Sequence, residues 1–132
     1  MKNIFVKSDE EFDINIYIAK GSDDNLYASI SEDVLKKNDK VADESIIKHT
    51  ITFKRPTYKD NVDIYSHSVK FEGGEMTVNP VNLRYIKFGT LLKDWTFKDS
   101  NGEDIEANLE NMNNLDSDLA GLIMDELEKI TG

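Results

Sequence analysis

The sequence contains no cysteine among its 132 residues. This absence excludes a disulfide framework and any chemistry that depends on a thiol, and it is consistent with a reducing compartment. A chain of this length buries a sufficient core without such a staple. We therefore expect a single domain, residues 1–132, with a β-rich part over 1–56 and a helix-rich part over 57–132.

Long apolar runs are also lacking. Residues 1–12 carry several charged side chains and have no apolar stretch of the kind that marks a signal peptide. No segment approaches the roughly 18 consecutive apolar residues that a membrane span requires. We therefore expect a soluble, cytoplasmic protein that has no membrane partner.

Basic residues are few. The chain has 16 lysines and arginines against 26 aspartates and glutamates, which gives a formal net charge of −10. Negative charge repels phosphate backbones, so we expect no binding to nucleic acid. The same charge could mimic nucleic acid or steer the protein toward a basic partner, although most acidic proteins simply have solvated surfaces.

Alternating apolar residues predict strands in the N-terminal half. Between residues 12 and 18, three isoleucines and a phenylalanine alternate with other residues, as in a half-buried strand. Residues 26–30 are a partner strand that follows turn-forming residues at 21–25. A third strand over 46–54 ends before Pro56, which cannot donate to a ladder. The residues expected on one face of that third strand are Ile47, Ile51 and Phe53.

Helical periodicity begins after Pro56. Thr57 is placed to cap a helix over 57–70, with Asp60 completing a weak capping box. The face of this helix would be lined by Val62, Tyr65 and Val69. Gly73 and Gly74 then form a turn.

Two further helices complete the prediction. Asn79 and Pro80 are an N-cap and a first helical residue, and they open a helix over 79–93. Its apolar stripe is Val81, Tyr85, Phe88, Leu92 and Trp95. The last helix starts near Asp116 or Ser117, and its stripe is Leu115, Leu119, Leu122, Ile123, Leu127 and Ile130. The fold class is therefore α+β, with a small antiparallel sheet in the N-terminal half packed by C-terminal helices.

No catalytic constellation is present. His49 lies on the apolar side of the third strand, where a lone histidine is more often structural than a ligand. Ser66, His67 and Ser68 are neighbours in sequence, and such neighbours rarely face one another as a triad does. The aromatic residues at 85, 88 and 95 have helical spacing, which favours a core position over a ligand pocket. We predict no catalytic residue and no enzyme activity.

Cofactor and metal motifs are absent as well. Gly73-Gly74 lacks the pattern of a phosphate-binding loop. The acidic segment 99–104 resembles part of a calcium loop, but Asp104 occupies the position where an EF-hand requires glycine. A polar turn with Gly102 at positive φ is favoured instead. We therefore assign no cofactor-binding and no metal-binding residue, and the sequence leaves the residues of any binding surface unknown.

Two segments between Ile51 and Ile130 resemble a known family. The helix over 79–93 is followed by the run Trp95 to Ile105, a helix start at Asn108, and a closing amphipathic helix. Residues 51–60 also place Pro-Thr and a following acid between a strand and a helix. This arrangement, from Ile51 to Ile130, is similar to small tail assembly chaperones of tailed bacteriophages. The strands over 12–30 have no counterpart in that family.

The resemblance implies a non-enzymatic morphogenesis protein that acts in the host cytoplasm. Its partner would be the tape measure protein or another tail subunit, held until polymerisation, and the chain could also form a homo-oligomer. One alternative is a structural virion component, such as a tail or neck adaptor. A second alternative is an acidic anti-defence inhibitor that mimics nucleic acid, for which the charge is the only support.

Overall fold

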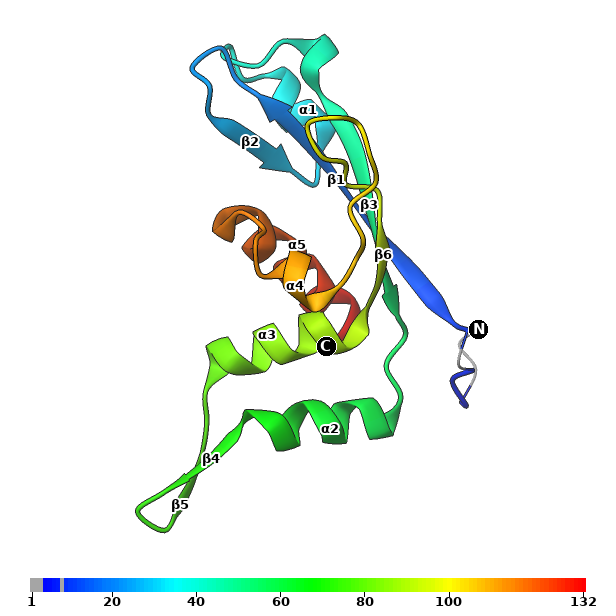
Figure 1. Ribbon diagram of the computed structural model, residues 1–132, viewed down its shortest axis with the longest axis vertical. Helices are drawn as coiled ribbons and strands as arrows, with labels where there is room; N and C mark the ends of the chain where they lie inside the picture. Colours follow the sequence, from blue (N-terminus) through cyan, green and yellow to red (C-terminus); the bar gives the residue numbers. More distant parts are fainter. Residues whose placement is uncertain (1–3, 8) are drawn as a thin grey trace.

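The computed structural model describes residues 4–7 and 9–132. Figure 1 shows a sheet whose helices gather toward one end, and a two-stranded ribbon that projects from the helical part. In chain order the elements are β1 (Glu11–Lys20), β2 (Leu26–Ser29), α1 (Glu32–Lys36), a 3-10 turn (Asp43–Ser45), β3 (Ile47–Lys54), α2 (Tyr58–Ser68), β4 (Val69–Glu72), β5 (Glu75–Val78), α3 (Pro80–Leu91), β6 (Leu92–Trp95), α4 (Leu109–Met112) and α5 (Ser117–Thr131).

The main sheet has the order β2-β1-β3-β6, and every neighbouring pair is antiparallel. Its three N-terminal strands match those predicted from alternation. Ile14 lies opposite Ile51 in the ladder, so their side chains share one face. Helices from the C-terminal half cover this face, and the predicted α+β class is confirmed.

Helix α5 supplies the largest share of that cover. Asp116 caps it by accepting a hydrogen bond from the backbone nitrogen of Leu119 at 3.0 Å. Leu119, Ile123 and Leu127 are buried in the same cluster as the isoleucines of β1 and β3. The terminal helix therefore joins the last part of the chain to the first strand. Ile130, which the sequence also assigned to the buried stripe, is half exposed near the helix end.

The opposite face of the sheet has a smaller cluster at the end of the β1–β2 hairpin. Ala19, Leu35 and Val41 are its buried members, with Tyr17 and Tyr27 packed around them. Helix α1 thus covers the side of this hairpin that α5 does not reach. Ile47 shares a face with Ile51, as the sequence predicts, but it is 58% exposed because it is the first residue of β3.

The helix predicted over 79–93 ends two residues early, and its apolar stripe is interrupted. Leu92 leaves the helical region at φ −63° and ψ 129°, and residues 92–95 form β6 on the edge of β3. Trp95 is buried as part of this strand, and its indole nitrogen donates to the backbone oxygen of Ile105 at 2.6 Å. Pairing with β3 gives the backbone partners that the local helical period could not reveal.

Helix α2 buries a different face from the one predicted. Its capping box is complete: the Asp60 nitrogen donates to the Thr57 hydroxyl at 3.1 Å, and the Thr57 nitrogen donates to the Asp60 carboxylate at 2.9 Å. The helix packs against α3 through Ile64 and Ser68, whereas Val62 and Tyr65 are 44% and 55% exposed. Val69 belongs to β4 and not to the helix.

The ribbon β4–β5 connects α2 with α3. Gly73 and Gly74 form its turn with φ values of 59° and 82°, which is the positive-φ requirement of the tightest hairpin turns. Phe71 lies opposite Met76, and Val69 lies opposite Val78. These four residues therefore share one face of the ribbon, and none of them belongs to a core cluster.

The two faces of α2 give a direct test of the packing. We predict that Ile64→Ala lowers the free energy of unfolding by about 2–5 kcal/mol, because it leaves a cavity at a side chain that is 2% exposed. Val62→Ala in the same helix should change it by no more than about 0.5 kcal/mol. Urea unfolding of both variants measures the difference, and equal losses would contradict this orientation of the helix.

Candidate protein-binding surface

Ser66, His67 and Ser68 lie within α2, and their side chains contact backbone oxygens of the same helix. Ser66 and Ser68 donate to the backbone oxygens of Val62 and Ile64 at 2.5 and 2.6 Å, and Nδ1 of His67 lies 2.7 Å from the oxygen of Asp63. Each side chain is directed to the preceding turn and not to another member of the run. The geometry therefore assigns no nucleophile–base pair here.

His49 lies, as expected from the sequence, on the apolar face of β3. Its ring is 5.1 Å from the ring of Phe97, and its Nδ1 is buried without a hydrogen-bond partner in the described part of the chain. Burial holds the pKa of His49 below its usual 6.5, and a hydrogen bond with the backbone of Thr96 offsets part of this effect. His49 is therefore a neutral packing residue at pH 7.

The acidic segment after Phe97 is a hydrogen-bonded turn. One carboxylate oxygen of Asp99 accepts from the backbone nitrogens of Asn101 and Glu103 at 2.8 and 3.0 Å. Gly102 has the positive φ, 77°, that the sequence predicts. Within residues 4–7 and 9–132, no three histidine or acidic side chains lie close enough together to hold a metal ion.

An apolar groove of about 470 Å³ lies between α3 and the α4–α5 pair. Phe88 forms part of its floor, and Met112 and Met124 line it from the opposite helices. Val81 and Tyr85 line the groove as well but remain 77% and 42% exposed. The sequence assigned both residues to the buried stripe of their helix, and the structure instead leaves them accessible.

Polar contacts join the walls of the groove. Arg84 of α3 pairs with Asp125 of α5 at 2.8 Å and with Glu128 at 3.4 Å. The hydroxyl of Tyr85 donates to the side chain of Asn113 at 2.9 Å. These exposed pairs add little stability by themselves. Phe88 of α3 and Met124 of α5 belong to one buried cluster, so the core sets the positions of the groove walls.

The ribbon places further exposed apolar residues next to the start of α3 in the chain. Val78 comes directly before the cap residue Asn79, and Val81 follows in the first helical turn. Phe71 and Met76 are 78% and 66% exposed. We refer to Val69, Phe71, Met76 and Val78 as the apolar finger.

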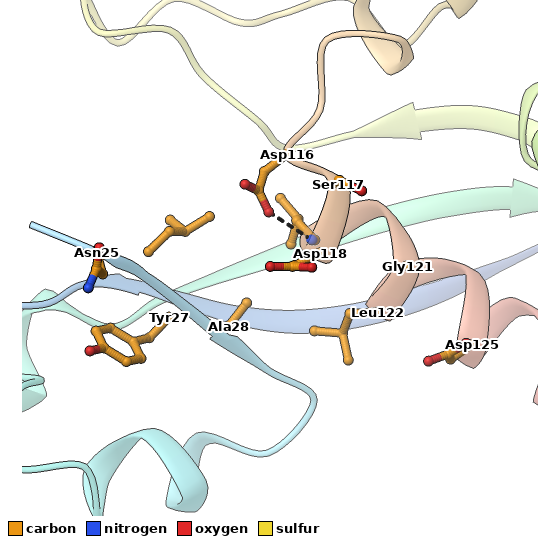
Figure 2. A pocket seen from close by; sticks show the side chains of 11 residues that line it. Asn25, Tyr27, Ala28, Asp116, Ser117, Asp118, Gly121, Leu122 and Asp125 are labelled. Atoms are coloured by element: carbon orange, nitrogen blue, oxygen red, sulfur yellow. Dashed lines mark hydrogen bonds between the residues drawn. The ribbon is translucent and has the colours of Figure 1, made fainter.

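A second groove, of about 840 Å³, lies on the other side of α5, against the edge strand β2 (Figure 2). Leu26, Ala28 and Leu122 give it apolar surface. Its charged lining residues are Asp116, Asp118 and Asp125, and no lysine, arginine or histidine lines it. The N-terminal half of α5 is therefore the shared wall of an apolar groove and an acidic groove.

Comparisons with known proteins identify no similar protein. No protein-family model, no curated protein and no solved structure matches the chain. No helix among the described residues is long and apolar enough to cross a membrane.

The sequence did contain a signal for the finger. In residues 69–78, apolar residues alternate on both sides of Gly73-Gly74, which is the pattern of a hairpin with a two-residue turn. The grooves left no such signal, because a helical stripe does not tell whether another element of the same chain covers it.

The buried histidine generates a pH prediction. The pKa of His49 is lower in the folded than in the unfolded protein, so the unfolded protein takes up its proton first as the pH falls below about 6.5. We expect the wild-type free energy of unfolding to fall between pH 7 and pH 5, and His49→Gln to lose part of this fall. Urea unfolding at pH 7, 6 and 5 measures it, and identical slopes in both proteins would exclude the effect.

Proposed function

We propose that the protein is a non-catalytic binding protein that covers an apolar segment of another protein. The observation that carries this proposal is the apolar surface formed by the groove and the finger, which the chain itself leaves open. Burying apolar surface contributes about 25 cal/mol per Å². Covering these apolar side chains therefore favours association, and exposed apolar patches mark interaction sites on soluble proteins.

The shape of the surface favours a protein segment over a small molecule. A small ligand could fill the groove, but it could not also cover Phe71 and Met76 on the projecting ribbon. A helix whose apolar residues recur at spacings of three and four places them along one line, which suits a groove between helices. Two methionines in the lining, Met112 and Met124, adapt to side chains of different shape.

The resemblance to tail assembly chaperones gives the proposal its specific form. In that form the partner is a helical segment of the tape measure protein or of another tail subunit, and the complex persists until the tail polymerises. A long helical partner exposes apolar stripes before assembly, so a protein that covers them prevents aggregation. Mass spectrometry of purified particles tests this part, because a chaperone should be absent from them and a structural component should be present.

The role of the apolar groove in binding is tested by placing a charged side chain at its rim. We expect Val81→Asp to reduce capture of the partner by at least about tenfold, because an aspartate there opposes desolvation of the apolar segment. The fold should persist, since residue 81 is exposed and lies in the first turn of α3, where an acid is favourable. Pull-down from infected cells, followed by titration of the recovered protein, measures the loss.

Val34→Asp is the matched control. It makes the same exchange at a valine that is 58% exposed in the first turn of α1, outside the residues that line the groove. The control should capture the partner as the wild type does. Equal capture by both variants, or equal loss in both, would reject the groove as the binding surface.

The finger is tested by removal of an aromatic ring. Phe71→Ser should leave the free energy of unfolding within about 0.5 kcal/mol, because the ring is 78% exposed. It should weaken binding of the recovered partner by about tenfold if the finger is part of the interface. Tyr58→Ser, at a ring that is 86% exposed on α2, is the comparison. A loss in this variant alone would move the interface to the outer face of α2.

A further inference from the structure

The negative charge of the protein is concentrated in its last quarter. Residues 99–132 contain ten aspartates and glutamates and one basic residue, Lys129, which is a net charge of −9. The rest of the chain has 16 acidic and 15 basic residues and is close to neutral. The acidic part comprises the turn after Phe97, α4 and α5, and it contributes the carboxylates of the groove beside β2.

Not all of these carboxylates are neutralised within the chain. Asp116 caps α5, and Asp125 pairs with Arg84 of α3. Asp118 forms no ion pair in the described part of the chain and points toward the groove in Figure 2. The apolar surface between these acids comes from Leu26 and Leu122, so the groove combines apolar walls with uncompensated negative charge.

The other border of the groove is an unpaired sheet edge. Strand β2 is the terminal strand of the four, and no described strand lies on its outer side. The Gly21 nitrogen donates to the Asn25 oxygen at 2.8 Å, and bonded and non-bonded pairs alternate along an antiparallel ladder. Leu26 and Ala28 are therefore in the non-bonded pairs of the β1–β2 register. Their backbone nitrogens and oxygens point away from β1, toward the free edge.

We propose that an extended basic segment of a protein partner adds to β2 as a fifth strand of the sheet. Residues of an added strand alternate between the two faces, about 7 Å apart on the same face. Lysines or arginines on the helix-covered face would extend their aliphatic stems over Leu26 and Leu122 and place their cationic groups near Asp116 and Asp118. Backbone hydrogen bonds to Leu26 and Ala28 supply affinity, and the acids select for positive charge.

Charge excludes the other obvious occupants. A second copy would bring another net charge of −10 to an acidic groove, and its own free edge, Leu26–Ser29, carries no basic residue. Nucleic acid would be repelled in the same way. The inference goes beyond the proposed function, because it concerns a different groove and a segment of opposite character, and it does not depend on the apolar groove.

The test uses a peptide of defined chemistry on the intact protein. The probe is an end-capped octapeptide in which lysine and threonine alternate, and amide hydrogen exchange is followed by NMR. We expect the Leu26 and Ala28 amides to exchange rapidly in the free protein and to become protected at least tenfold by the peptide. Affinity should fall at least tenfold between low and high salt, because exposed charges are screened. An alternating glutamate–threonine peptide should not bind.

Two controls separate strand addition from nonspecific attraction. Asp118→Lys should weaken binding of the lysine peptide at least tenfold, whereas Asp63→Lys, the same charge change on α2, should weaken it less than twofold. N-methylation of every second peptide residue removes the hydrogen-bond donors of one strand edge. Methylation at the odd or at the even positions gives two peptides. One of them should no longer protect the Ala28 amide, and the other should still protect it.

Several outcomes overturn the inference. They are equal losses in the two charge variants, absence of protection at both Leu26 and Ala28, or insensitivity to both methylated sets. Association of the protein with itself at the β2 edge, detected by sedimentation, would assign that edge to a second copy instead. The Val81→Asp variant distinguishes the two proposals, because it should bind the lysine peptide as the wild type does. Partner capture through the apolar groove with no peptide binding would leave the proposed function in place and reject the fifth strand.

Discussion

Packing of α5 against β1 and β3 is the contact on which the rest of the structure depends. Leu119, Ile123 and Leu127 bury an isoleucine-rich sheet face that would otherwise lie open to water. Complete burial of one such side chain contributes about 1.5–3 kcal/mol. Phe88 and Leu91 of α3 belong to the same buried cluster, and α5 has a groove on each of its two sides. The stability of the core and the placement of both candidate surfaces thus have a common origin.

Much of the fold is encoded locally, and this part could be predicted from the sequence. The capping residues Thr57, Asn79 and Asp116 all start helices, because a side-chain oxygen in that position satisfies free backbone nitrogens. Alternation located β1 and β3, since both have buried residues on one face, and the turn residues at 21–25 located β2 as the partner strand. These signals need only a few neighbouring residues, and distant parts of the chain do not change them.

The predictions that differ from the structure concern residues whose conformation or burial depends on contact with an element distant in sequence. Leu92 and Trp95 continue a helical period, yet β3 offers an unpaired edge, and the backbone pairs with it instead. In α2 two apolar faces compete, and α3 selects the one that contains Ile64. The apolar groove could not be found for the same reason. Val81 and Tyr85 have the spacing of core residues, and only the arrangement of α4 and α5 leaves them accessible.

The ribbon β4–β5 extends the molecule beyond its helical part. Two antiparallel helices need only a short connection of a few residues, but the chain places two four-residue strands and a glycine turn between α2 and α3. At about 3.3 Å per residue, each strand extends about 13 Å. Neither core cluster contains a described residue of the ribbon, and Phe71 and Met76 are largely exposed, so these two side chains add little to the packing of the core. Substitution of these two side chains is therefore expected to alter the surface of the ribbon while the stability of the body stays nearly constant.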